Sequence, residues 1–115
     1  MLGQVQGGQL KALAVTTAER SKLAPDLPTM AEAGLSGFDI STWFGLLAPA
    51  GTPKDVIAKW NAEVTKILNS PDMRERLTAQ GAEPAPTTPE QFAAFIQSEI
   101  PKYARIVKIS GAKVD

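Results

Sequence analysis

Two apolar runs in the first half of the chain predict extended structure. Residues 10–16 (LKALAVT) carry a single lysine in an otherwise apolar stretch. Short runs without alternation are typical of strands buried in a parallel sheet, although a short buried helix has the same appearance. The threonines that close the run favour the strand. Residues 38–48 form the second predicted strand, because aromatic and aliphatic side chains concentrate in the middle of that segment.

The second half of the chain has the period of amphipathic helices, with apolar residues recurring every three or four positions. The predicted helices span residues 52–69, 70–81 and 88–111. Each begins with Thr-Pro or Ser-Pro, in which the hydroxyl caps the helix and proline takes the first helical position. Thr52, Ser70 and Thr88 are therefore the predicted caps, and Gln91 completes a capping box. Pro101 should kink the last helix or break it in two.

Two smaller segments complete the secondary-structure prediction. Thr29 and Glu32 have the spacing of a capping box, and Gly34 should end that helix after about one turn. Residues 1–9 hold three glycines and three glutamines and are predicted to form a loop.

Composition excludes several classes of function. The 115 residues suffice for one modest domain, and 12 basic residues balance 12 acidic ones, so no basic face for nucleic acid is expected. The absence of histidine and cysteine removes a Ser-His-Asp triad, a cysteine nucleophile and thiolate zinc sites. No run reaches the ~20 apolar residues of a membrane span, and the first residues lack the pattern of a signal peptide. We predict no catalytic residue, no metal site and no cofactor.

The predicted elements do not make a complete sheet. Two strands with several helices are fewer strands than an α/β domain normally contains. A lone parallel pair would leave both sheet edges unpaired and much apolar surface uncovered. The pattern indicates the tail of a larger protein, and two copies could also cover their open edges by pairing or swapping strands.

Several blocks in order resemble one known family. They are LAVTTAER (13–20), PDLPTMAEAG (25–34), WFGLLAPAGTP (43–53), NAEVTKIL (61–68), TPEQFAAFIQSE (88–99) and the closing VKISGAKVD (107–115). The chain from Leu10 onward resembles the C-terminal portion of the substrate-binding receptors of tripartite tricarboxylate transporters, also called the Bug family. Family members are more than twice as long as this chain, so the resemblance identifies a truncated fragment.

The resemblance implies an α/β fold of the type II periplasmic-binding-protein class, of which this chain would supply about two strands and three to five helices. Residues 1–42 would form the tail of the second lobe and the return crossover. Residues 43–115 would form the mostly helical C-terminal part of the first lobe. The family binds a small organic carboxylate in the periplasm, without chemical turnover, and passes it to membrane transporter subunits.

Four residues are candidates for ligand binding. Trp43, Phe44 and Gly45 would lie just past the interlobe crossover, where ligands bind, and Gly45 would allow close backbone approach. Core or hinge packing is the alternative for the two aromatic residues. Arg20 follows the end of a predicted strand, where a cation could hold a carboxylate, or could simply be solvated.

The Pro-Ala-Gly-Thr-Pro joint at 49–53 is predicted to be structural, because it ends a strand and caps a helix. Two functional hypotheses follow. The first is a truncated solute-binding receptor for an organic carboxylate, with no nucleic-acid partner. The alternative is a self-associating structural fragment, a homodimer formed through the incomplete sheet, with no ligand binding of its own.

Overall fold

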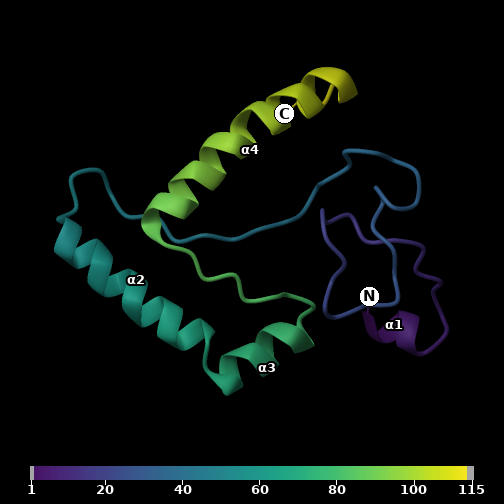
Figure 1. Cartoon of the computed structure of the whole chain (residues 1–115), viewed down its shortest axis with the longest axis horizontal. Helices are drawn as coiled ribbons and strands as arrows, with labels where there is room; N and C mark the ends of the chain where they lie inside the picture. The colour runs from purple at the N-terminus through teal and green to yellow at the C-terminus, as the bar shows by residue number, and fades with distance from the viewer. Residues whose placement is uncertain (1, 114–115) are drawn as a thin grey trace. The chain divides into compact units, whose positions relative to one another are not determined.

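The computed structural model describes residues 2–113 and contains four helices in that range (Figure 1). They are α1 (Leu2–Gln6), α2 (Lys54–Leu68), α3 (Pro71–Ala79) and α4 (Pro89–Ser110). The number of helices agrees with the three to five expected. The α1 helix is a correction, because the glycine-rich start was predicted to form a loop.

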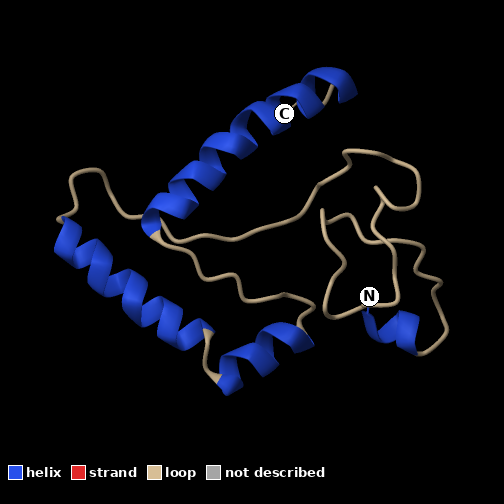
Figure 2. Cartoon of the chain, in the orientation of Figure 1, coloured by secondary structure: helices blue, strands red, loops and turns tan. Residues whose placement is uncertain are grey.

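Neither predicted strand forms, and residues 2–113 contain helices and loops alone (Figure 2). The first run contributes one isolated parallel bridge, between Val15 and Thr29. The Val15 N–H donates to the Pro28 carbonyl and the Met30 N–H to the Val15 carbonyl, both at 2.9 Å. A strand exists only as part of a ladder, and these runs find too few backbone partners within the chain to build one.

The helix boundaries follow the predicted local signals closely. α4 begins with a complete capping box, in which the Gln91 N–H donates to Thr88 Oγ1 and the Thr88 N–H donates to Gln91 Oε1. It ends at Gly111, whose φ of 67° is in the left-handed region that glycine tolerates. The Thr52 cap is wrong, because its hydroxyl donates to the Pro49 carbonyl at 2.8 Å and α2 starts without a side-chain cap.

Two further helix predictions need correction. The segment from 29 to 34 is a sequence of turns, not a helix, although the Thr29–Glu32 capping-box hydrogen bonds do form. α4 continues through Pro101 over 22 residues, so the proline does not break the helix in two, while a kink at this position stays a prediction. A long amphipathic helix with strong caps at both ends can tolerate the loss of one backbone hydrogen bond.

Apolar side chains are poorly covered wherever the structure describes their burial. Among residues 3–5 and 7–113, whose burial the structure describes, no hydrophobic residue is buried, and the two buried residues are polar, Thr29 and Glu99. The described chain divides into two compact units, one containing residues up to 47 together with 75–83, and the other containing 48–74 and the residues from 84 onward. Within the second unit, α2 and α4 contact each other. None of the described helices combines the length and the apolar character that crossing a membrane requires.

Candidate functional site

Arg20, one of the predicted ligand-binding residues, is held by a neighbouring carboxylate. Its Nε donates to both oxygens of Glu32, at 2.9 Å to Oε2 and 3.2 Å to Oε1. Its Nη1 donates to the Pro25 carbonyl at 3.3 Å. Arg20 therefore fastens the loop that follows the first apolar run to the turn that begins at Thr29.

Glu32 has a second role in the same cluster, because it closes its own turn. The Thr29 N–H donates to Glu32 Oε2 at 2.8 Å, and the Glu32 N–H donates to Thr29 Oγ1 at 3.1 Å. The Thr29 backbone hydrogen bond, followed by the hydrogen bond from Arg20, lowers the pKa of Glu32 below its ordinary value of 4.5. The ionised carboxylate is thus the form that holds both the turn and the arginine.

A carboxylate that sequence reasoning missed holds the same loop from a distant position. Glu83 Oε1 accepts hydrogen bonds from the Ser21 hydroxyl at 2.6 Å and from the Lys22 N–H at 3.0 Å. Ser21 Oγ in turn accepts from the Leu23 N–H at 3.2 Å. Ser21 and Glu83 are 62 residues apart, and no spacing pattern signals a pair at that separation.

Acidification should loosen the turn at Thr29. Because the folded pKa of Glu32 is lowered, its stabilising effect is fully present above the ordinary value of 4.5 and is lost as pH falls through the folded value. We expect the Thr29 amide proton to move toward its random-coil NMR shift over that range. In Glu32→Gln, which keeps a side-chain acceptor but cannot titrate, the same resonance should stay flat. An identical pH profile in the variant would contradict the assignment.

The other three predicted ligand-binding residues lie in extended chain. Phe44 is almost fully exposed, at 92%, while Trp43 is exposed to 39% and has interaction partners elsewhere in the chain. Gly45 is exposed as well. The hydrogen bonds of Arg20 go to Glu32 and Pro25 and not to this segment. The structure therefore places the arginine and the Trp-Phe-Gly segment in separate hydrogen-bonding environments.

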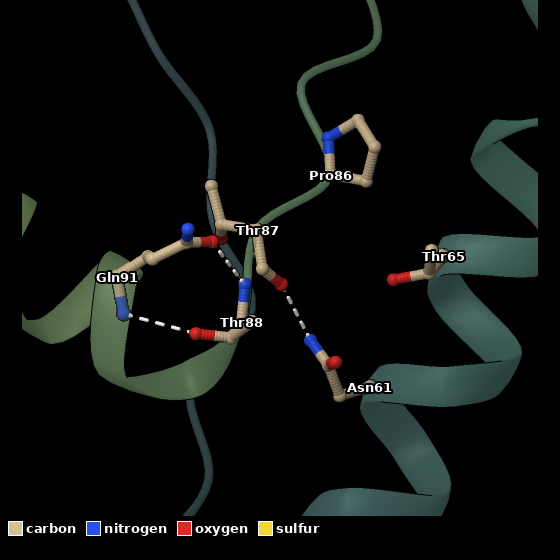
Figure 3. A pocket seen from close by; sticks show the side chains of 6 residues that line it. All are labelled: Asn61, Thr65, Pro86, Thr87, Thr88 and Gln91. Carbon is tan, nitrogen blue, oxygen red and sulfur yellow. Dashed lines mark hydrogen bonds between the residues drawn. The ribbon is translucent and has the colours of Figure 1, made fainter.

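A shallow, open hollow lies between α2 and the start of α4, with a volume of about 240 Å³ (Figure 3). It is lined by Asn61, Thr65, Pro86, Thr87, Thr88 and Gln91. The polar groups there serve local structure, since Asn61 Nδ2 donates to the Thr87 carbonyl at 2.8 Å and the capping box closes the start of α4. The polar groups that line the hollow therefore connect α2 to the residues at the start of α4.

Metal coordination has no support in residues 2–113, where no three acidic side chains gather into a possible ion site. Glu99 is the one buried carboxylate in that range, at 6% exposure, and it pairs with Lys102 one turn along α4. The side-chain hydrogen bonds described above form a framework that fixes loops and helix ends.

Comparison with known proteins gives the class of that framework. A model of the tripartite tricarboxylate transporter family receptors matches residues 1–112, so the chain belongs to this family. Protein BugT of Bordetella pertussis is 40% identical over 114 residues, which are 99% of this chain and 35% of BugT. The chain thus spans about a third of the length of the first curated relatives that it matches.

Solved structures give the same result for the fold. The periplasmic binding protein BugD matches with a TM-score of 0.75 and 37% identity, over 96% of this chain and 38% of BugD. Rpa4515 of R. palustris with adipate matches at 0.74 and 34% identity, over 95% of this chain and 36% of that one. MatC of Rhodopseudomonas palustris with bound malate matches at 0.69 and 40% identity, over 92% and 37%. The chain therefore has the fold of a part of a periplasmic binding protein.

Proposed function

We propose that this chain is part of a periplasmic receptor that binds a small organic carboxylate and delivers it to the membrane subunits of a tripartite tricarboxylate transporter. The observation that carries the proposal is the chemistry of the ligands in two solved relatives, adipate and malate. Both are dicarboxylates, and the two relatives match this chain at 34% and 40% identity. The receptor acts by binding, without chemical turnover of its ligand.

The mechanism we propose is a shift between open and closed lobes. Residues 1–42 belong to the second lobe and the return crossover, and residues 43–115 to the first lobe. Contacts that a ligand makes only when the lobes are closed favour the closed form by the free energy of those contacts. The closed form is then the one that the transporter subunits recognise.

We assign Trp43, Phe44 and Gly45 to the wall of the cleft. The exposure of Phe44 supports this assignment, because an aromatic ring with almost no packing partners in the chain is available to a ligand. We place Arg20 in a supporting position, since Glu32 and the Pro25 carbonyl already take its hydrogen bonds. Its charge can still draw carboxylates toward the cleft.

A chimeric receptor tests the proposal. In this chimera, the aligned region of Bordetella pertussis BugT is replaced with the present chain, which aligns over 99% of its length. Isothermal titration should show binding of at least one of adipate, malate, citrate and glutamate. The uncharged diamide of adipate should bind at least about 100-fold more weakly than adipate, because charge-assisted hydrogen bonds to both carboxylates are lost.

The chimera also defines the results that would contradict the proposal. Equal affinity for adipate and its diamide would show that the site does not select carboxylates. A folded chimera that binds none of the four acids would refute the ligand class. Unmodified BugT, titrated with the same compounds, is the matched control for the effect of the exchanged region.

A further inference from the structure

The last part of α4 and the residues just after it carry a local surplus of positive charge. Residues 100–113 (IPKYARIVKISGAK) hold 4 of the 12 basic side chains of the chain and none of the 12 acidic ones. They lie toward the yellow end of α4 in Figure 1. Because the chain as a whole is neutral, this surplus is not part of a generally basic surface. We call residues 100–113 the basic end.

The four cations of the basic end differ in their partners. Lys102 is paired, because its ammonium group lies against the Glu99 carboxylate. Arg105, Lys108 and Lys113 are exposed. In the part of the chain that the structure describes, none of these three side chains forms an ion pair or a hydrogen bond. Three cations are therefore available to a partner outside the chain.

The geometry of the helix places two of these cations on one face. Arg105 and Lys108 are three positions apart, so they are neighbours on the helix surface. Tyr103 and Ile106 lie toward the other side of the helix and are half-buried. Ile109 lies one turn beyond Arg105 and is 74% exposed. The exposed face thus combines positive charge with an apolar side chain.

The helix dipole does not explain this face. Basic side chains interact favourably with the free carbonyl groups at the C-terminal end of a helix, but the effect falls off within the last turn. Lys108 lies in the last turn of α4, whereas Arg105 is more than one turn from the end at Ser110. Arg105 therefore has neither an ion pair nor a helix end to stabilise within the described chain.

The size and chemistry of the basic end favour an anionic lipid surface as its partner. A standard protein interface uses about 20–30 residues on each side, many more than the exposed cations and isoleucine here. Sites for single-stranded nucleic acid add aromatic platforms, and the one aromatic residue of the basic end, Tyr103, is half-buried. A membrane surface needs neither, since it attracts cations by charge and takes up apolar side chains at the headgroup boundary.

We propose that the basic end holds the chain at the surface of a membrane containing anionic phospholipids, with Arg105, Lys108 and Lys113 at the headgroups and Ile109 among them. Each basic residue near such a surface raises partitioning roughly fivefold, so three of them give about 100-fold. A receptor held in this way meets its membrane subunits by diffusion along the surface. The inference goes beyond the proposed function and does not require the carboxylate ligand.

Vesicle flotation tests the proposal with the whole chain. The probes are vesicles of phosphatidylcholine alone, and of phosphatidylcholine and phosphatidylglycerol in equal parts. At low salt the chain should partition at least about 30-fold more strongly to the anionic vesicles. In about 1 M salt, where charges are screened beyond about 3 Å, the preference should vanish. The neutral vesicles measure the binding that apolar surface gives without charge.

Two double variants with the same net charge identify the surface responsible. Arg105→Gln with Lys108→Gln should weaken partitioning to the anionic vesicles about 25-fold, both in the chain and in the chimeric receptor. Lys59→Gln with Lys66→Gln removes two exposed cations from α2, which also carries acidic side chains, and should change it by at most about threefold. Because all four side chains are exposed, both variants should keep the helix content measured by circular dichroism.

Four results would overturn the proposal. They are equal partitioning to neutral and anionic vesicles, equal losses in the two double variants, an effect of Arg105→Gln with Lys108→Gln in the chain but not in the chimera, and tighter binding to duplex DNA than to anionic vesicles. A chimera that binds anionic vesicles but no dicarboxylate would contradict the proposed function alone. The reverse result would contradict this inference alone.

Discussion

Replacing Trp43 with alanine in the chimeric receptor is expected to weaken dicarboxylate binding by about tenfold to 100-fold. A large aromatic side chain on a cleft wall contributes contact area that alanine cannot replace, and each tenfold change corresponds to about 1.4 kcal/mol. Isothermal titration with the acid that the chimera binds best measures the effect. The change should appear in the dissociation constant, with the chimera still folded.

The chain contains its own control for this prediction. Trp60 lies on α2 and is 65% exposed, so Trp60→Ala removes the same side chain from a surface without a proposed ligand role. We expect its affinity to match that of the unchanged chimera. If Trp43→Ala and Trp60→Ala bind the ligand equally well, Trp43 does not belong to the cleft wall.

Gly34→Ala is expected to lower the free energy of unfolding of the chimeric receptor by about 1–3 kcal/mol. Gly34 has a φ of 112°, a conformation that residues with a Cβ rarely adopt. No heavy atom lies within 4 Å of a Cβ built at this position, so the cost is backbone strain and not a clash. The turn there is fixed by a 2.9 Å hydrogen bond from the Leu35 N–H to the Met30 carbonyl. Urea denaturation measures the change.

Gly3→Ala is the matched control for backbone strain. Gly3 lies in α1, has no positive φ, and also has open space around an added Cβ. Alanine there should leave stability unchanged or raise it slightly, because it restricts the unfolded chain. Equal losses in the two variants would mean that the φ of Gly34 does not determine the effect.

Local signals predicted the helices well because their causes lie within a few residues. The capping box of Thr88 and Gln91 involves neighbours in sequence and was confirmed, and the helix that was predicted to run to residue 111 ends at Gly111. Thr52 shows the limit of this reasoning. Its hydroxyl could either accept a hydrogen bond from the first turn of the helix or donate one to the Pro49 carbonyl, and the sequence pattern did not distinguish these two roles.

The predicted strands failed for the opposite reason, since a strand depends on partners that sequence periodicity does not contain. Residues 10–16 and 38–48 have the composition of strands, yet they make few backbone hydrogen bonds within the chain. The pairing of Glu83 with Ser21 was invisible in the sequence for the same reason of distance. Arg20 could be selected as a site candidate from the sequence, and its ligand role stays a prediction, while its hydrogen bonds to Glu32 became visible only in the fold.

The uninterrupted course of α4 through Pro101 has a mechanical consequence. Proline has no N–H, so the carbonyl of Gln97 loses its acceptor role toward the residue four positions later, and the ring crowds that carbonyl. The free energy needed to bend α4 is therefore lower at Pro101 than elsewhere along the helix. The last turns of α4 can tilt to follow whatever surface lies beside them, while the capped first turns keep their direction.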